Sequence, residues 1–189
     1  MKQVLVLASQ SPRRKQLLEM LGLPILVQPS DIYEVPLPRE APLAYSRRLA
    51  REKAQAGIGE FVLGADTIVV LDEHLLEKPV DDADAVRMLT LLQGRTHEVI
   101  TSVALVAKGK LYEATDVTAV TFRAADEAYL GAYVATGESR DKAGAYGIQG
   151  YGAALVERVE GDFFGVMGLP VRLVLKLLVE AGWEYRFGR

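Results

Sequence analysis

Residues 4–14 read Val-Leu-Val-Leu-Ala-Ser-Gln-Ser-Pro-Arg-Arg, and this stretch indicates how the chain begins to fold. The apolar run from Val4 to Ala8 is typical of a strand buried on both faces. Ser11 then offers a helix N-cap and Pro12 a first-turn proline, so a helix is predicted to follow at once and to end at Gly22. A buried strand that passes directly into a helix favours an α/β protein.

Further helices and strands are predicted along the rest of the chain. Helices are expected over residues 44–56, from 81 or 82 to 93, over 125–135 and over 171–181. Strands are expected at 25–27, 61–63, 68–71, 75–79, 98–107, 112–122 and 154–159, with a hairpin turn at 108–110. These units predict an α/β fold with a mixed central sheet. No internal repeat interrupts the pattern, so residues 1–189 are interpreted as a single domain.

Composition excludes several classes of protein. Half of the 189 residues are hydrophobic and 25% are charged, which is typical of a chain that folds around a packed core. The net charge of −3 argues against broad binding of nucleic acid. The chain has no cysteine, which removes disulfides, thiolate zinc sites and cysteine nucleophiles and fits a reducing compartment. The run from Val4 to Ala8 is too short for a signal peptide or a membrane span, so a soluble cytoplasmic protein is expected.

Two arginines in the first turn of the first helix are the most informative charged residues. The helix macrodipole disfavours the cations Arg13 and Arg14 at that end, so an anion is expected to compensate them. A phosphate would do so, because free helix amides, the hydroxyls of Ser9 and Ser11 and two guanidiniums all donate toward one point. The alternative is a solvated basic turn paired with a surface carboxylate such as Glu19.

Lys53 is the second anomaly. On a helical wheel for residues 44–56 it falls between Leu49 and Ala50, in the middle of the apolar arc. An ammonium that points inward needs a partner. The alternative is that the apolar stem of the lysine covers the edge of the core and the charge reaches solvent. Arg48 and Glu52, four residues apart, are interpreted as an ordinary surface pair.

Residues 64–67, Gly-Ala-Asp-Thr, follow a buried apolar run and place the carboxylate of Asp66 where open α/β sheets build ligand sites. An unpaired charge there would be costly, so Asp66 needs a cation. A divalent metal bound to phosphate oxygens, or Lys78, would supply it. The alternative is an aspartate that caps a turn.

Residues 137–152 form a glycine-rich stretch in which the backbone is expected to approach a ligand closely. Gln149 could read a base edge, because its amide offers both a donor and an acceptor. A flexible loop is the alternative. His74 and His97 are isolated and are interpreted as structural or surface residues. No P-loop, GxSxG elbow or complete GxGxxG occurs.

Taken together, six segments resemble the Maf family of nucleotide pyrophosphatases. They are residues 7–14, 64–67, 77–79, 94–97, 141–150 and 166–170. The resemblance runs over nearly the whole chain. It implies an inosine-triphosphatase-like α/β fold with two lobes flanking a cleft, and a homodimer in many members. It also implies metal-dependent hydrolysis of nucleoside triphosphates to the monophosphate and pyrophosphate.

The resemblance also assigns roles to individual residues. Asp66 matches the proposed catalytic base or metal-associated carboxylate, and Glu34 lies where many relatives place a second acidic residue for the metal. The triphosphate-binding set is matched by Ser9, Arg13, Arg14, Lys53 and Lys78. The Tyr-Gly-Ile-Gln-Gly motif resembles a subgroup that acts on dTTP and UTP, whose specificity positions are matched by Arg13, Thr67 and Gln149.

The expected reaction is attack of water on the α-phosphorus of dTTP or UTP, assisted by a divalent metal such as Mg²⁺, Mn²⁺ or Co²⁺. Two other functions stay open. One is an inosine or xanthosine triphosphate pyrophosphatase on the same fold. The other is an interaction protein that restrains cell division during septum formation, the role after which the family was first named.

Overall fold

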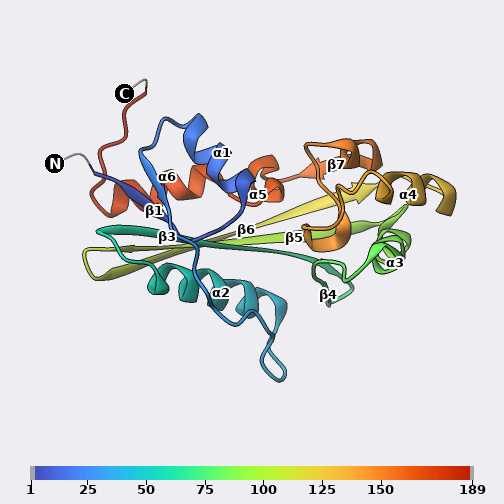
Figure 1. Cartoon of the computed structure of the whole chain (residues 1–189), viewed down its shortest axis with the longest axis horizontal. Helices are drawn as coiled ribbons and strands as arrows, with labels where there is room; N and C mark the ends of the chain where they lie inside the picture. The colour runs from blue at the N-terminus through green and yellow to red at the C-terminus, as the bar shows by residue number, and fades with distance from the viewer. Residues whose placement is uncertain (1–2, 188–189) are drawn as a thin grey trace. The chain divides into compact units, whose positions relative to one another are not determined.

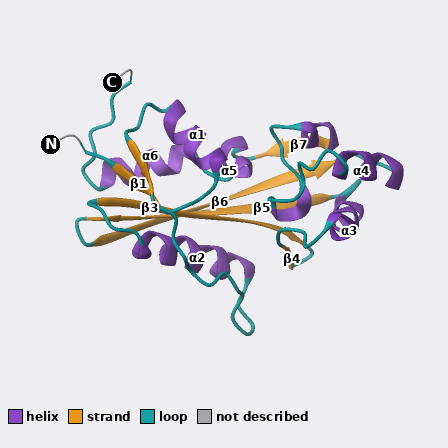
Figure 2. Cartoon of the chain, in the orientation of Figure 1, coloured by secondary structure: helices purple, strands orange, loops and turns teal. Residues whose placement is uncertain are grey.

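The computed structural model describes residues 3–187 and shows a mixed α/β protein (Figures 1 and 2). Within these residues the strands are β1 (Leu5–Leu7), β2 (Ile25–Val27), β3 (Phe61–Leu71), β4 (His74–Leu76), β5 (Thr96–Ala107), β6 (Lys110–Phe122) and β7 (Val156–Glu160). The helices are α1 (Pro12–Met20), α2 (Pro42–Ala56), α3 (Asp82–Leu92), α4 (Glu127–Val134), α5 (Phe163–Met167) and α6 (Val171–Glu180). Two short 3₁₀ helices, η1 (Ala143–Ala145) and η2 (Tyr151–Leu155), lie in the glycine-rich stretch.

The seven strands belong to one sheet with the order β2-β1-β3-β5-β6-β7, and β4 pairs with β3. Strand β1 is parallel to β2 and to β3, with Leu7 opposite Leu63, whereas β4 runs antiparallel to β3 and β7 antiparallel to β6. The mixed α/β sheet predicted from the sequence is confirmed. The parallel part of the sheet includes the strand that leads into α1, as the opening residues indicate.

The chain divides into two compact units. Unit 1 contains described residues from 3–67, 101–116 and 168–187, and unit 2 contains residues 68–100 and 117–167. Strands β3, β5 and β6 contribute residues to both units. The interpretation of the chain as one domain stays a prediction, as does the expected cleft.

Unit 1 is built on β1, β2 and the first part of β3. Helix α2 lies on one side of these strands and helices α1 and α6 on the other (Figure 1). Small side chains hold α2 close to the sheet, because Ala50 and Ala54 pack against Ala104 of β5. A Cβ atom at Gly64 would overlap with the backbone of Ala50 and Ala54, so only glycine fits there. Gly64 therefore allows α2 to pack directly against β3, two residues before Asp66.

Unit 2 has its own apolar core, in which α3 and α4 pack together. Its centre includes a buried group of three rings: His97, Phe122 and Tyr146 meet edge to face with ring centroids 4.7–5.5 Å apart. His97 is thus a core residue and His74 is exposed, as the sequence interpretation expects. In the described part of the chain no helix is both long enough and apolar enough to span a bilayer.

Three elements differ from those predicted. Residues 64–67 do not interrupt β3, which runs through from Phe61 to Leu71, because glycine is accepted in the strand where α2 approaches. Residues 154 and 155 belong to η2 and not to a strand, and the short helix α5 was not predicted. Helices η2 and α5 have five residues each and lie beside glycines or short turns. A stretch this short does not show a periodicity that identifies a helix or a strand.

Candidate active site

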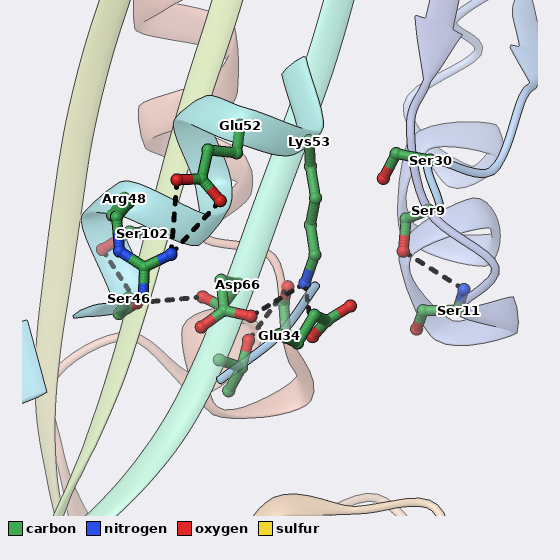
Figure 3. A network of polar contacts seen from close by, with 12 residues as sticks. Ser9, Ser11, Ser30, Glu34, Ser46, Arg48, Glu52, Lys53, Asp66 and Ser102 are labelled. Atoms are coloured by element: carbon green, nitrogen blue, oxygen red, sulfur yellow. Dashed lines mark hydrogen bonds and ion pairs between the residues drawn. The ribbon is translucent and has the colours of Figure 1, made fainter. Parts of the chain in front are cut away.

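An ion pair between Lys53 of α2 and Asp66 of β3 lies at the centre of the polar residues of unit 1 (Figure 3). Lys53 Nζ is 2.9 Å from Asp66 Oδ1, and the two side chains are 8% and 7% exposed. Lys53 therefore points inward, and its stem does not carry the charge to solvent. Asp66 lies within a strand and does not cap a turn. The cation that pairs with Asp66 among the described residues is thus Lys53, and not Lys78, which the sequence analysis offered beside a divalent metal.

Glu34 is the second carboxylate on the ammonium of Lys53. Its Oε2 is 2.9 Å from Lys53 Nζ, and its side chain is 44% exposed. Lys53 thus bridges one buried and one half-exposed carboxylate, and Figure 3 shows both beside the end of the lysine side chain. The structure therefore places the carboxylates of Glu34 and Asp66 on the same ammonium, and a metal role for Glu34 stays a prediction.

Arg48 holds the loop that carries Glu34. It contacts Glu52 at 3.2 Å as predicted, but it also binds both oxygens of Glu40 at 2.7 Å and the carbonyl of Val35 at 2.9 Å. The hydrogen bond from Arg48 lowers the pKa of Glu40. The interaction of Arg48 is therefore not limited to an ordinary surface ion pair with Glu52. Arg48 also joins the loop next to Glu34 to helix α2, which carries Lys53.

Arg14 forms a second polar centre in the same unit. Its Nε donates to the carbonyl of Gly168 at 2.8 Å, Nη1 donates to Ser9 Oγ at 3.0 Å, and Nη2 donates to Thr67 Oγ1 at 3.2 Å. A guanidinium has five N–H groups, so two remain beyond these three bonds with residues of the described range. Arg14 thus joins the loop after β1, the strand that bears Asp66 and the turn before α6.

The charge of Arg14 is only partly balanced by the neighbouring carboxylates. Burial lowers the pKa of Arg14 below its ordinary value; Asp66 and Glu34 offset part of this shift, and Arg13 adds to it. Glu19, the surface partner considered for the two arginines, lies instead 3.7 Å from Lys15. Arg14 therefore belongs to the same electrostatic cluster as Asp66 and Glu34.

The start of α1 has the local structure that the sequence predicts. Ser11 is the N-cap, and its side chain accepts from the backbone N–H of Arg14 at 3.4 Å, with Pro12 as the first helical residue. Ser9 Oγ accepts from the N–H of Ser11 at 3.2 Å and from Arg14. Arg13 follows Pro12 in this first turn, where the ends of helices bind anions.

Two contributors to this cluster had no predicted role. Thr101 of β5 is fully buried, and its hydroxyl donates to Thr67 Oγ1 at 3.0 Å. Gly168 adopts φ +116°, a conformation that favours glycine, and presents its carbonyl to Arg14. The only sequence signal for Thr101 is the polar pair Thr-Ser inside an otherwise apolar strand, and Gly168 was visible only as part of a motif.

The carboxylates suit a divalent cation that is shared with a substrate. Asp66 Oδ2 is buried and has no hydrogen-bond partner among residues 3–187, which leaves an acceptor for a cation or water. In this described range no three His, Cys, Asp or Glu side chains gather to enclose a metal. Mg²⁺ is commonly held by one or two carboxylates together with substrate phosphates, and Asp66 with Glu34 fits that arrangement.

The remaining predicted residues belong to unit 2. Lys78 is exposed and follows β4, and Gln149 is exposed between η1 and η2. Unit 1 thus brings together Ser9, Arg14, Lys53, Asp66, Thr67 and Glu34, with Arg13 beside Arg14. A shared role for Lys78 and Gln149 with these residues stays a prediction.

A family model described as Maf-like protein matches residues 4–181. The chain belongs to the Maf family. Relatives named dTTP/UTP pyrophosphatase include one from Moorella thermoacetica, 51% identical over 184 residues, which cover 94% of this chain and 95% of the relative. Another, from Alcanivorax borkumensis, is 48% identical over 188 residues, 96% of this chain and 97% of the relative. A third, from Escherichia coli O6:K15:H31, is 47% identical over 179 residues, 92% and 91% respectively.

Membership of the Maf family agrees with the motifs that first pointed to it. The Maf motif at residues 7–14 supplies Ser9 and Arg14, and the motif at 64–67 supplies Asp66 and Thr67. The motif at 166–170 supplies the carbonyl that binds Arg14. Three Maf motifs that lie far apart in the sequence therefore meet in one hydrogen-bonded cluster.

Proposed function

We propose that this chain hydrolyses dTTP and UTP to the nucleoside monophosphate and pyrophosphate, as its named relatives do. The observation that carries the proposal is the cluster of Arg14, Lys53 and Asp66 with Ser9 and Thr67. A buried carboxylate paired with a lysine, close enough to influence an arginine that is held by two hydroxyls, suits a reaction in which a polyphosphate is bound and its charge is redistributed.

The cationic residues bind the triphosphate. The two N–H groups that Arg14 retains, the guanidinium of Arg13 and the ammonium of Lys53 are donors to phosphate oxygens. Ser9 adds a hydroxyl at the helix N-terminus, and Lys78 of unit 2 is proposed as a further cation for the same chain of phosphates. Because pyrophosphate gains negative charge as it leaves, cations placed in advance lower the barrier, and this is the main catalytic contribution.

Asp66 acts on the attacking water. Lys53 occupies Oδ1, which fixes the carboxylate, and leaves Oδ2 to accept the proton of a water that attacks the α-phosphorus. General-base assistance of this kind contributes about 10²- to 10⁴-fold. Asp66 and Glu34 would hold a divalent cation, which when bound neutralises phosphate charge and polarises the phosphoryl oxygens.

Gln149 and the loop around it are proposed to read the base. The amide of Gln149 can pair with the imide edge of thymine or uracil, which presents both a donor and acceptors. A base with a different pattern would leave buried polar groups unpaired, at a cost of about 1–3 kcal/mol. Arg13 and Thr67 are proposed as the further specificity positions.

The test of this function is the product formed from a panel of nucleotides. Purified protein is mixed with dTTP, UTP, GTP, ITP or XTP, with and without Mg²⁺, Mn²⁺ or Co²⁺, and pyrophosphate and orthophosphate are measured separately. Pyrophosphate from dTTP and UTP, with little from the purine nucleotides, is expected. Equal kcat/KM values for all five would refute the base reading, and release of orthophosphate alone would refute the pyrophosphatase.

The other functions considered are not favoured. The three relatives carry the name dTTP/UTP pyrophosphatase, which refers neither to inosine or xanthosine nucleotides nor to septum formation. A homodimer and a cytoplasmic location stay predictions from the sequence.

A further inference from the structure

Glu138 of unit 2 holds the glycine-rich segment that carries Gln149. Its Oε1 accepts from the N–H of Gly152 at 2.9 Å and from the hydroxyl of Tyr133 at 3.0 Å. Its Oε2 accepts from the N–H of Tyr151 at 2.8 Å. Three donors thus converge on one carboxylate, two of them from the backbone two and three residues after Gln149.

Tyr133 extends this anchor to the other side of Gln149. The hydroxyl that donates to Glu138 accepts from the N–H of Gly147 at 3.1 Å. Tyr133 is 6% exposed and extends from α4, and burial raises its pKa, so the hydroxyl stays protonated and serves as both donor and acceptor. The backbone is therefore tied to the Glu138–Tyr133 pair at residue 147 and again at residues 151 and 152.

The glycine at position 150 is explained by the same carboxylate. A Cβ atom at Gly150 would overlap with the carboxylate of Glu138, and one at Gly147 would lie 3.2 Å from Glu138 Oε1 and 2.7 Å from Lys142 Cε. The expectation was that these glycines let the backbone approach a ligand. At Gly150 the space that a side chain would need is instead filled by Glu138.

The hydrogen bonds of the Glu138 carboxylate go to Tyr133 and to the backbone of this segment. Among residues 3–187 this carboxylate pairs with no lysine or arginine, since the ammonium of Lys142 contacts the backbone carbonyl of Glu138 and the carboxylate of Asp141, each at 2.6 Å. Ile148 is buried in the core of unit 2, whereas Gln149 next to it is exposed. The backbone is thus fixed on both sides of one exposed amide side chain.

We infer that Glu138 is a positioning residue for substrate specificity, which acts by fixing the backbone that presents Gln149 to the base. This inference rests on the proposed role of Gln149. A glutamine whose backbone can shift would reach the edges of bases that differ in size and position, and its amide offers both a donor and an acceptor to each. A fixed backbone keeps the start of the side chain in one place, so a base whose edge lies elsewhere pairs less well and is penalised.

The test compares kcat/KM for dTTP and for GTP in one preparation, because the ratio of the two cancels any loss of folded protein. In Glu138→Gln, an amide group replaces one acceptor and faces a backbone N–H, so the anchor is broken. The dTTP-to-GTP ratio is expected to fall about tenfold. Tyr133→Phe removes only the hydroxyl and is expected to lower the ratio in the same direction, which provides a second variant should Glu138→Gln not fold.

Gln149→Ala and the double variant with Glu138→Gln complete the experiment. If Glu138 acts through Gln149, the double variant has the same ratio as Gln149→Ala alone. Arg140→Ala is the control, since Arg140 lies in the same loop with its side chain 69% exposed and pairs with Asp82. It is expected to keep the wild-type ratio.

The possible failures are distinguishable. If Gln149→Ala leaves the ratio unchanged, the proposed base reading is wrong and the inference falls with it. If Gln149→Ala lowers the ratio but Glu138→Gln and Tyr133→Phe do not, only the inference is overturned. Multiplicative effects of the two changes in the double variant would also overturn it, because Glu138 would then act independently of Gln149.

Discussion

Lys53 Nζ lies 2.9 Å from Asp66 Oδ1, and both side chains are more than nine-tenths buried. Buried ion pairs are a poor source of stability, because the loss of hydration of both charges offsets most of their attraction. This pair instead holds a carboxylate and an ammonium in fixed positions. Oδ2 of Asp66 is left to accept a hydrogen bond or a cation, and the ammonium of Lys53 also binds Glu34.

Gly64 is expected to control the distance between these two residues. In Gly64→Ala the new Cβ would overlap with the backbone of Ala50 and Ala54, so helix α2 and Lys53 must move away from β3. A loss of about 1–3 kcal/mol in the free energy of unfolding is expected, together with a lower kcat/KM for dTTP. Urea denaturation and pyrophosphate release measure the two effects.

Gly131→Ala is the matched control for that change. Gly131 lies within α4, and a Cβ there would have no described atom within 4 Å apart from its chain neighbours and the backbone of its own helix. Alanine in a helix is expected to leave activity unchanged and to raise the free energy of unfolding by about 0.5–1 kcal/mol. If Gly64→Ala were as stable and active as the control, the close approach of α2 to β3 would not matter for the site.

Arg14→Lys is expected to lower kcat/KM for dTTP by about 10²-fold, because one ammonium cannot reproduce the planar, three-way contact with Ser9, Thr67 and Gly168. The measurement is steady-state pyrophosphate release, with thermal denaturation to check folding. Arg47→Lys serves as the control, since Arg47 is exposed on α2 and its side chain donates a hydrogen bond to Thr115. Equal activity in both variants would remove Arg14 from the active site.

His97 is expected to make stability depend on pH. Burial lowers the pKa of His97 to about 4, from an ordinary value of 6.5, and its Nε2 is 2.9 Å from the hydroxyl of Tyr146. Because the unfolded chain binds the proton more tightly than the folded one, His97 contributes stability above pH 6.5 that is lost as the pH falls toward 4. The slope from this group approaches 1.4 kcal/mol per pH unit within that window.

Urea denaturation between pH 4.5 and 7.5 tests this slope. His97→Gln is expected to have a smaller dependence on pH than the wild type, although it is less stable throughout because a buried ring is lost. His74→Gln, a change at an exposed histidine, is expected to keep the wild-type slope. Parallel curves for the wild type and His97→Gln would show that His97 does not titrate in this way.

Much of this site could be predicted from local patterns. Ser11 and Pro12 indicate where α1 begins, and the helical position of Lys53 places it on the apolar face, where an inward charge was one of two interpretations. The need of Asp66 for a cation also followed from its apolar surroundings. What local patterns left open was the identity of that cation, because Lys53 and Asp66 meet only when α2 packs across Gly64.

Other contacts had no local signal. The carbonyl of Gly168 meets Arg14 across 154 residues, and Thr101 meets Thr67 across 34. A backbone carbonyl carries no mark in the sequence, and a threonine in a strand is ordinary. Glu138 was overlooked for a similar reason, because its neighbours in sequence do not reveal that its carboxylate lies against Gly150.

Pyrophosphate release from dTTP by Asp66→Asn tests the central claim most directly. With Asp72→Asn, an exposed aspartate that pairs with Arg95, as the control, the account predicts wild-type release from the control. Release by Asp66→Asn is expected to fall by at least about 10²- to 10⁴-fold, with a melting curve that still shows a folded protein. A folded Asp66→Asn protein that releases pyrophosphate from dTTP at the wild-type rate would contradict the account.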